Sequence, residues 1–356
     1  MQLEYLPVLP QKMDYRIGIC GAGGIVNDAH LPAYRKAGFH VECIYDKDRA
    51  RAEQTAAKFE IGRVCTSVEE LAERVDIVDI AVPAQENNPV IAALAAAEVA
   101  LLIQKPLAED WQTAKDTVAQ IRASGVLAAV NQQMRWEPGV RACRHLLASG
   151  ALGELYDIAF LIYVHTPWHM WGWLKEKETI EVLYHSIHYL DSIRYLAGYE
   201  PLSLYASGST RPGYDAAGET RICTHLTFPG QLRATVLSNH HAEFGEEGQQ
   251  SEFRVDATDG ALVRRLGLLL DYPRGAPDAL RYIRRSEGKW RQAEFEEKWF
   301  PDAFVGPMSS LMRALAGEIE KPETDVEDNL KTLRLVFAAY ESMRTGQAID
   351  LTRKDS

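Results

Sequence analysis

The chain has 356 residues, enough for two domains, and its 46% hydrophobic and 25% charged content is that of an ordinary globular protein. A formal net charge of −11 argues against nucleic acid or an anionic membrane as a partner, because both require a basic face. No apolar run approaches the roughly 18 residues of a membrane helix, no secretory leader opens the sequence, and the five cysteines include no C-x-x-C pair, so a cytoplasmic protein is expected.

A glycine turn opens the ordered part of the chain, after an extension predicted over residues 1–13. The segment Arg16–His30 predicts a buried strand, a tight turn and a helix start. Glycines at the turn let the backbone approach a pyrophosphate, and the free amides of the helix start would face that anion. Val26 stands where the dinucleotide fingerprint usually has glycine or alanine, so an ordinary strand-turn-helix corner stays an alternative. The residues expected to contact the cofactor here are Gly21, Gly23, Gly24, Ile25 and Val26.

A carboxylate follows the second predicted strand. Val41–Tyr45 ends at Asp46, where a dinucleotide fold places an acid that accepts hydrogen bonds from the adenosine ribose. Such a carboxylate repels a 2′-phosphate and so favours NAD over NADP, whereas Lys47 and Arg49 keep NADP open. A plain turn role for Asp46 is the competing interpretation.

Strand and helix patterns alternate as far as Val130, which predicts a parallel sheet covered on both faces over residues 14–133. Val82 and Pro83 follow one of these strands, at the carboxyl edge where such sheets bind ligands. The predicted strands are Arg16–Cys20, Val41–Tyr45, Ile77–Ala81, Ala100–Ile103 and Leu127–Val130. The predicted helices are Leu31–Gly38, Ala50–Phe59, Val68–Arg74, Pro89–Ala97 and Asp110–Ala123.

The pattern changes after Arg135, and residues 134–356 predict a second domain with a mostly antiparallel sheet, because β-rich runs follow one another across short turns. The predicted strands are Leu155–His165, Leu202–Ser207, Arg221–Phe228, Gln231–Asn239, Glu252–Ala257 and Ala261–Leu270. The predicted helices are Gly139–Ala148, Met308–Glu320 and Glu327–Arg344.

Gln104 and Lys105 directly follow a strand that should end at the same edge as the glycine turn. A lysine beside a nicotinamide and a substrate hydroxyl can donate to that oxygen and stabilise the alkoxide that develops as hydride leaves. A surface lysine before a helix-starting proline is the competing interpretation.

A helix predicted over Glu181–Asp191 places ionisable groups on one face. At helical spacing Tyr184, His185 and His188 lie near Glu181 and Asp191. His188 could accept a hydroxyl proton while a neighbouring acid orients its ring. Packing histidines are one alternative, and a metal site from Glu181, His185 and His188 is another, disfavoured because no further ligand has diagnostic spacing, so no metal is predicted.

Tryptophans and histidines crowd the stretch from His165 to Trp173. Aromatic faces stack on the C–H faces of sugars, which favours a carbohydrate pocket wall, although core or interface packing is equally typical of aromatics. Arg135 and Trp136 could add an anion contact, or Arg135 could form a plain salt bridge. The residues expected to line the substrate pocket are Arg135, Trp136, His165, Trp168, His169, Trp171, Trp173, Glu181 and Asp191.

Together these motifs resemble the Gfo/Idh/MocA family of NAD(P)-dependent oxidoreductases. The turn at Gly21 with His30-Leu-Pro-Ala, the Gln104-Lys105-Pro106-Leu107 motif, and the His188-Tyr-Leu-Asp191 helix are similar to the family's opening turn, Glu-Lys-Pro motif and His-x-x-Asp helix. The resemblance covers Tyr15 to Leu351. It implies a Rossmann domain, an open-faced antiparallel substrate domain, Lys105 and His188 as the catalytic pair, and a homodimer or homotetramer formed through the open sheet.

The chain departs from the family pattern at the position four residues before the histidine, where Tyr184 replaces the usual aspartate, and at Gln104, which replaces glutamate. Glu181 could supply the missing carboxylate, or Tyr184 could donate a proton. The leading hypothesis is an NAD-dependent dehydrogenase acting on a sugar-like or cyclic polyol secondary alcohol. The alternatives are an NAD-dependent glycosidase that oxidises a glycoside transiently, including an anionic or sulfonated one, and a non-catalytic dinucleotide-binding regulator.

Overall fold

The computed structural model describes residues 3–272 and 274–353, and it forms two compact units. The first unit combines Leu6–Glu137 with Glu297–Leu333. The second unit is built on Pro138–Glu296 with the described residues of both termini. The division of the chain into an extension over residues 1–13 and domains over residues 14–133 and 134–356 stays a prediction.

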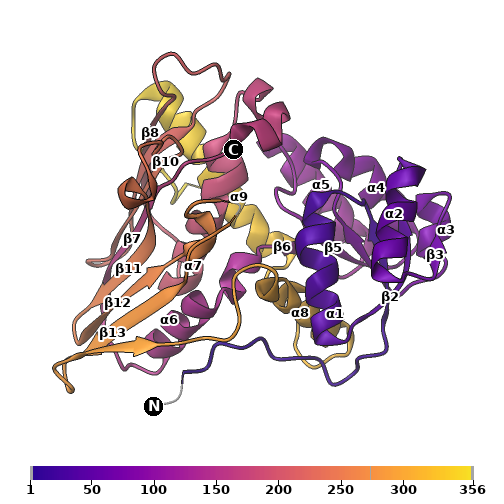
Figure 1. Ribbon diagram of the computed structural model, residues 1–356, viewed down its shortest axis with the longest axis horizontal. Coiled ribbons are helices and arrows are strands. Elements are labelled where there is room, and N and C mark those ends of the chain that lie inside the picture. The colour runs from indigo at the N-terminus through magenta and orange to yellow at the C-terminus, as the bar shows by residue number, and fades with distance from the viewer. Residues whose placement is uncertain (1–2, 273, 354–356) are drawn as a thin grey trace. The chain divides into compact units, whose positions relative to one another are not determined.

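The first unit contains a six-stranded parallel sheet in the order β3-β2-β1-β4-β5-β6. Figure 1 labels β2, β3, β5 and β6 of this sheet. The strands are β1 (Arg16–Cys20), β2 (His40–Tyr45), β3 (Arg63–Val64), β4 (Ile77–Ile80), β5 (Ala100–Gln104) and β6 (Ala128–Asn131). The helices are α1 (Leu31–Ala37), α2 (Arg49–Phe59), α3 (Val68–Ala72), α4 (Asn87–Ala96), α5 (Trp111–Ser124) and α8 (Val305–Leu315).

Local sequence explains where these helices begin and end. Asp48 caps α2 by accepting a hydrogen bond from Arg51 N, and Asp110 caps α5 by accepting one from Thr113 N. Gly125 ends α5 in the left-handed conformation that glycine adopts without steric cost. The strands read as near-continuous apolar runs because helices cover both faces of a parallel sheet. β2 and β3 lie on one side of β1, and β4, β5 and β6 lie on the other, so the order of the strands in the sheet reverses direction at β1. Folds of this kind bind their ligands at the carboxyl ends of the strands beside that point.

The second unit contains a nine-stranded sheet in the order β14-β13-β12-β11-β7-β10-β9-β8-β15, antiparallel except for the parallel pair β10 and β7. Alternate residues of its strands are buried, so one face packs and the other is exposed. The strands are β7 (Leu155–Tyr163), β8 (Ser203–Ser209), β9 (Arg221–Thr227), β10 (Arg233–Asn239), β11 (Gln250–Ala257), β12 (Gly260–Arg265), β13 (Ala279–Arg284), β14 (Trp290–Ala293) and β15 (Ile349–Asp350). The helices are α6 (Pro138–Ala148), α7 (Ile187–Ala197) and α9 (Val326–Thr345), of which residues from Arg334 onward belong to this unit.

The fold class and most elements are confirmed, with three corrections. The predicted strand Ala261–Leu270 is wrong beyond Arg265, because Gly267 N donates to the Asp278 carboxylate at 2.7 Å and opens a short 3₁₀ turn. The helix predicted from Met308 to Glu320 begins at Val305 and ends at Leu315. Four described strands, β3, β13, β14 and β15, were not predicted. β3 and β15 have only two residues each, and β14 is a short edge strand whose residues are mostly exposed and polar.

Gly306 lies against Trp136 in the core of the first unit and provides a test of this packing. A Cβ on Gly306 would stand 2.0 Å from the Trp136 Cγ atom, far inside van der Waals contact. Alanine favours a helix over glycine by only about 1 kcal/mol. Overpacking costs about 1–3 kcal/mol or more, so Gly306→Ala is expected to lower the free energy of unfolding.

Chemical denaturation measures the change. Gly62→Ala, where a Cβ meets no atom within 4 Å, is the control and should stay within about 0.5 kcal/mol of wild type. Equal stability of the two variants would contradict the packing.

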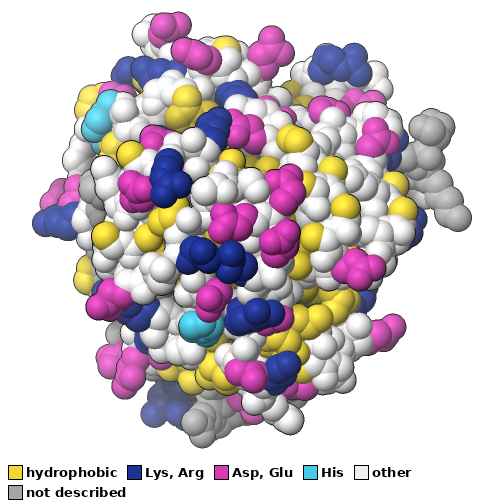
Figure 2. All heavy atoms as spheres, turned by 90° about the vertical axis from the view of Figure 1, so that its right-hand side faces the viewer, with side chains coloured by type: hydrophobic (Ala, Val, Ile, Leu, Met, Phe, Trp, Pro, Cys, Tyr) yellow, Lys and Arg dark blue, Asp and Glu magenta, His cyan; other side chains and the backbone are white. Residues whose placement is uncertain are grey.

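The surface carries charges of both signs. On the face shown in Figure 2, acidic side chains lie among basic ones, so no extended basic field forms there. Within residues 3–272 and 274–353, no helix is both long and apolar enough to cross a membrane.

Candidate active site

The glycine turn after β1 has the geometry that a dinucleotide phosphate requires. Gly21 has φ +109°, and a Cβ there would stand 2.6 Å from the Ala81 carbonyl oxygen, so the protein's own packing demands glycine. Gly23 is different, because nothing lies within 4 Å of its Cβ position. Packing therefore does not explain Gly23, and the open space is what the approach of a pyrophosphate would require. The helix that follows includes a π-helical segment over Val26–His30, a distortion frequent at functional sites.

Asp46 ties the end of β2 to this turn. Its Oδ2 atom accepts a hydrogen bond from Ala22 N at 2.7 Å, and its Oδ1 atom accepts one from Asp48 N at 2.8 Å. Lys47 lies 2.5 Å from the carboxylate of Glu86. Asp46, which is predicted to contact the ribose, thus also fixes the glycine turn. Lys47, which could have favoured binding of NADP, is paired with the carboxylate of Glu86.

The remaining predicted cofactor residues follow β4 and β5. Val82 and Pro83 come after β4, and Gln104 ends β5 with its side-chain oxygen accepting a hydrogen bond from Lys105 N at 3.0 Å. Asn87 donates from Nδ2 to the Leu107 carbonyl at 3.0 Å and holds the loop after Lys105. Because all strands of this sheet are parallel, the ends of β1, β2, β4 and β5 meet at one edge. The fold therefore brings the predicted cofactor residues of the first unit together.

Arg135 and Trp136 lie inside the first unit. Arg135 lies 2.5 Å from the Asp328 carboxylate and donates to the Glu323 carbonyl at 2.9 Å. This is the salt bridge that was the alternative interpretation of Arg135. Trp136 is 3% exposed and packs in the core. Neither arrangement supports a substrate contact.

The histidine helix starts as a π-helical segment, Val182–Ser186, and continues as α7. The buried carboxylate of Glu219 caps its start by accepting a hydrogen bond from Val182 N at 3.1 Å and one from the Tyr340 hydroxyl at 2.8 Å. Burial raises the pKa of Glu219, against these hydrogen bonds, which lower it. Glu219 therefore positions the helix start on which Tyr184 and His185 lie.

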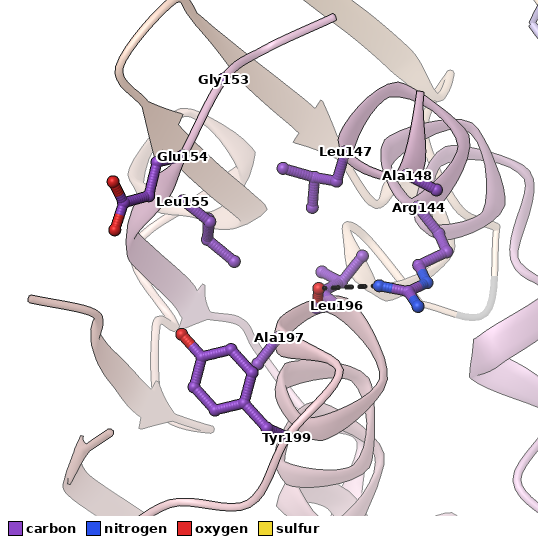
Figure 3. A pocket seen from close by; sticks show the side chains of 9 residues that line it. All are labelled: Arg144, Leu147, Ala148, Gly153, Glu154, Leu155, Leu196, Ala197 and Tyr199. Atoms are coloured by element: carbon purple, nitrogen blue, oxygen red, sulfur yellow. Dashed lines mark hydrogen bonds between the residues drawn. The ribbon is translucent and has the colours of Figure 1, made fainter. Parts of the chain in front are cut away.

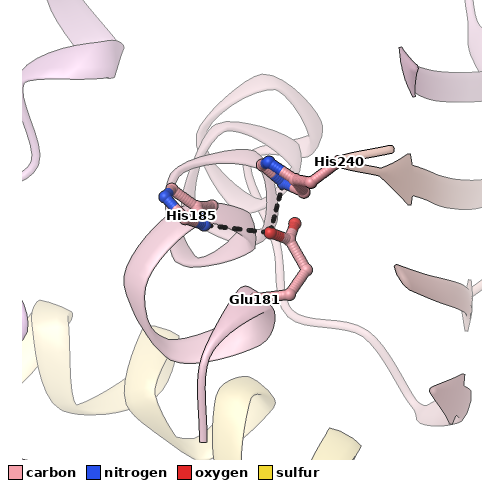
Figure 4. A group of neighbouring side chains, drawn as sticks. All are labelled: Glu181, His185 and His240. Atoms are coloured by element: carbon pink, nitrogen blue, oxygen red, sulfur yellow. Dashed lines mark hydrogen bonds and ion pairs between the residues drawn. The ribbon is translucent and has the colours of Figure 1, made fainter. Parts of the chain in front are cut away.

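Glu181 lies between two imidazoles (Figure 4). Its Oε2 atom is 3.0 Å from His185 Nδ1 and 2.5 Å from His240 Nε2, and its Oε1 atom accepts a hydrogen bond from Ser186 at 2.6 Å. Burial opposes ionisation of Glu181, but His240 and His185 outweigh it and hold the pKa of this carboxyl below its ordinary range. The His185 side chain is 28% exposed, so this buried carboxylate orients a histidine that solvent or a ligand reaches.

His188 and Asp191 lie further along α7, and both are buried. The Asp191 carboxylate is 3.7 Å from the Arg194 guanidinium. Arg194 in turn contacts Glu200 at 2.7 Å. Asp191 thus belongs to an ion-pair network that fixes the helix, and a direct role in substrate binding stays a prediction.

The aromatic stretch divides into a buried part and an exposed part. The buried Trp168 packs with its ring centroid 6.1 Å from that of His185 and 5.5 Å from that of His240. Trp173 is 51% exposed and meets Tyr184 edge-on, with ring centroids 5.4 Å apart. The other residues predicted to line the pocket are Trp171, which contacts Tyr272, and the exposed His165 and His169. Trp168 and Trp173 therefore lie beside the histidine helix.

His240, His241 and Tyr214 were not predicted from the sequence. β10 pairs with β7 in parallel, with Asn239 beside Tyr163, so the two strands end together and His240 and His241 lie beside the chain that leads to Trp168. Tyr214 packs on His241 with ring centroids 4.7 Å apart. The two adjacent histidines directly after the predicted strand Gln231–Asn239 could have indicated a site. The sequence does not show, however, which strand pairs with Gln231–Asn239.

A pocket of about 320 Å³ lies elsewhere in the second unit (Figure 3). Arg144 at its wall donates to the Leu196 carbonyl at 3.4 Å, and the side chain of Glu154 lies on the opposite side. No predicted site residue lines this pocket, so it does not belong to the candidate active site.

His241 makes stability depend on pH. Burial, followed by the nearby Arg211, lowers its pKa to about 4 from an ordinary value of 6.5. The folded protein thus takes up this proton less readily than the unfolded chain, and stability falls as the pH drops from about 6.5 toward 4. Between pH 6.5 and pH 5 the loss is about 1–2 kcal/mol. We expect denaturation curves of His241→Asn to lack this part of the loss.

The exposed His225 provides the matched control. His225→Asn is expected to keep the wild-type dependence of unfolding free energy on pH. A His241→Asn variant whose stability falls as steeply as that of wild type would show that His241 titrates normally in the folded protein.

Comparison with known proteins identifies the family. Residues 15–132 match the model described as "Oxidoreductase family, NAD-binding Rossmann fold", and residues 140–263 match the GFO/IDH/MocA C-terminal domain. D-apiose dehydrogenase of Paraburkholderia graminis is 27% identical over 92% of this chain and 88% of that protein. Inositol 2-dehydrogenase of Rubrobacter xylanophilus is 28% identical over 93% of this chain and 91% of that protein.

Solved structures share the fold. An oxidoreductase from Agrobacterium radiobacter, in complex with NAD⁺, L-tartaric acid and magnesium, superposes with a TM-score of 0.81 at 22% identity, over 95% of this chain and 99% of that one. A levoglucosan dehydrogenase in complex with NADH and levoglucosan has a TM-score of 0.80 at 16% identity, over 95% of this chain and 100% of that one. With the two family models matching both parts of the chain in order, this protein belongs to the Gfo/Idh/MocA family of NAD-binding oxidoreductases.

Proposed function

We propose that this protein transfers a hydride between a secondary alcohol of a sugar, sugar derivative or cyclic polyol and NAD. The observation that carries the proposal is the turn at Gly21 and Gly23, which has open space at Gly23 and stands at the sheet edge that also bears Lys105. Relatives that act on D-apiose and inositol support a carbohydrate or polyol substrate. When bound, NAD would supply the hydride acceptor, and Gly21, Gly23, Gly24 and Asp46 would hold it.

Lys105 and His188 have the proposed catalytic roles, which rest on the family motifs. The Lys105 ammonium would donate a hydrogen bond to the substrate oxygen and stabilise the charge that develops there. His188 would accept the hydroxyl proton, because an imidazole titrates near neutral pH.

Trp168 and Trp173 support a carbohydrate pocket beside the histidine helix. Trp173 is half exposed, and its ring meets that of Tyr184 edge-on. A sugar C–H face could stack on such a ring while His185 binds a hydroxyl. We place the other predicted wall residues, His165, His169 and Trp171, in the same pocket.

A second candidate function is a glycosidase that oxidises the sugar transiently, eliminates the aglycone and returns the hydride. The Glu181 and His185 pair favours it, because a buried ionised carboxylate 3.0 Å from a partly exposed imidazole is an additional acid/base device. Tyr184, the neighbour of this pair, replaces the aspartate of simple dehydrogenases in the family.

One assay distinguishes the two candidates. Purified protein is incubated with NAD and a panel of free pyranoses, inositols and chromogenic glycosides, and NADH absorbance and aglycone release are followed together. Accumulating NADH with a free polyol or sugar would establish the dehydrogenase. Aglycone release that requires NAD but leaves no net NADH would establish the glycosidase. Neither signal from any member of the panel would argue against both.

NAD is the proposed cofactor in preference to NADP, because the Asp46 carboxylate lies beside the glycine turn and Lys47 is paired with Glu86.

A cytoplasmic location is proposed from the cysteines, four of them buried and none in a disulfide.

We further propose a homodimer or homotetramer through the exposed face of the nine-stranded sheet. This face bears Tyr156 and Tyr205, which are 45% and 42% exposed. Sedimentation of wild type and of Tyr205→Glu would test the interface.

A further inference from the structure

Three side chains from two separate segments converge at one point in the second unit. Glu181 and His185 come from the start of the histidine helix, and His240 follows β10 (Figure 4). One oxygen or ring nitrogen of each lies within 4.8 Å of the others. Glu181 and His240 are buried, and the side chain of His185 is 28% exposed.

The contacts of the two imidazoles converge on one carboxylate oxygen. His240 Nε2 is 2.5 Å and His185 Nδ1 is 3.0 Å from the same atom, Glu181 Oε2. Two imidazole nitrogens and a carboxylate oxygen gathered in this way could share one cation.

The outer contacts of these residues match those of metal ligands. The second nitrogen of His240, Nδ1, lies 2.5 Å from the Thr166 hydroxyl, which fixes the ring and leaves Nε2 facing Glu181. The second oxygen of Glu181 accepts the hydrogen bond from Ser186. Ligating histidines and carboxylates are held by such hydrogen bonds, which orient them and raise their basicity. Trp168 packs on both imidazoles and adds an apolar wall.

We propose that Glu181, His185 and His240 bind a divalent transition-metal ion of the zinc class. Two histidines and one glutamate are a ligand set of catalytic zinc sites, which keep a fourth position open for water or a substrate oxygen. The partly exposed side chain of His185 marks the side from which such an oxygen would approach. The proposal does not depend on hydride transfer. It departs from the sequence-based prediction of no metal, and it differs from the disfavoured alternative of Glu181, His185 and His188 by placing His240 in the third position.

Binding of Co²⁺ tests the site. Tag-free full-length protein is dialysed against a chelator and titrated with Co²⁺, whose visible absorption reports coordination, and Zn²⁺ stoichiometry is measured by elemental mass spectrometry. We expect one ion per chain with the absorption of a four-coordinate site. Glu181→Gln, His185→Ala and His240→Ala should each weaken binding at least about 100-fold, and Thr166→Val, which removes no ligand, about 10- to 100-fold.

His225→Ala, which removes a histidine outside the cluster, should bind like wild type, and circular dichroism should show that each variant is folded. Absence of stoichiometric Co²⁺ and Zn²⁺ binding to wild type would overturn the proposal without reference to any variant. Stoichiometric binding that persists in both Glu181→Gln and His240→Ala would overturn it as well. Neither result would affect the hydride-transfer function, which is measured separately with NAD.

Discussion

Lys105→Met is expected to lower the rate of hydride transfer by about 10²- to 10³-fold while the affinity for NAD stays nearly unchanged. Methionine keeps most of the side-chain volume but removes the ammonium group that would donate to the substrate oxygen. The hydrogen bonds that Gln104 and Asn87 make to the loop do not involve the ammonium group, so they should persist. Turnover and NADH binding are measured separately on the same preparation.

Lys58→Met is the control for this substitution, because Lys58 is exposed on α2 outside the predicted site. It should keep wild-type turnover. Undiminished turnover in Lys105→Met would remove Lys105 from the mechanism. Equal losses of turnover and NAD affinity would make it a cofactor-binding residue instead.

Gly23→Val is expected to weaken NAD binding at least tenfold, about 1.4 kcal/mol, without lowering the melting temperature. No protein atom lies within 4 Å of the Cβ position, so the new side chain occupies space that packing leaves open. The cost should appear when the pyrophosphate approaches the backbone. Titration with NADH, followed by fluorescence, measures the affinity.

Gly21→Ala is the complementary variant, because a Cβ on Gly21 would meet the Ala81 carbonyl and the backbone is in the positive-φ region. It should lose stability as well as NAD affinity. If Gly23→Val bound NADH as tightly as wild type, the cofactor would not approach the turn at Gly23.

The first unit was largely predictable because its determinants are local. The apolar strands, the glycine turn and the Asp46 that follows the second strand are close in sequence, and parallel pairing then places their ends at one sheet edge. The π-helical segment over Val26–His30 was not predictable, because the residues that replace the third fingerprint glycine do not show how the helix accommodates them.

The second unit shows where local patterns fail. The Glu181 and His185 contact follows from helical spacing, but the third member, His240, is placed by the parallel pairing of β10 with β7. Arg135 pairs with Asp328, 193 positions away, and no local pattern shows that partner. Trp136 resembles a ligand platform in sequence and is packed by Gly306 in the core. Long-range pairing thus decides which of the predicted polar and aromatic residues meet.

Transfer of deuterium to the cofactor tests the central claim most directly. The protein is mixed with NAD⁺ and carbon-deuterated pyranoses, inositols or their glycosides, quenched during turnover, and the cofactor is analysed by mass spectrometry. Hydride transfer predicts reduced cofactor with one added deuterium, whether the reaction is a net oxidation or a redox-neutral cleavage. Cofactor that gains no deuterium from any substrate that the protein converts would contradict the proposed function.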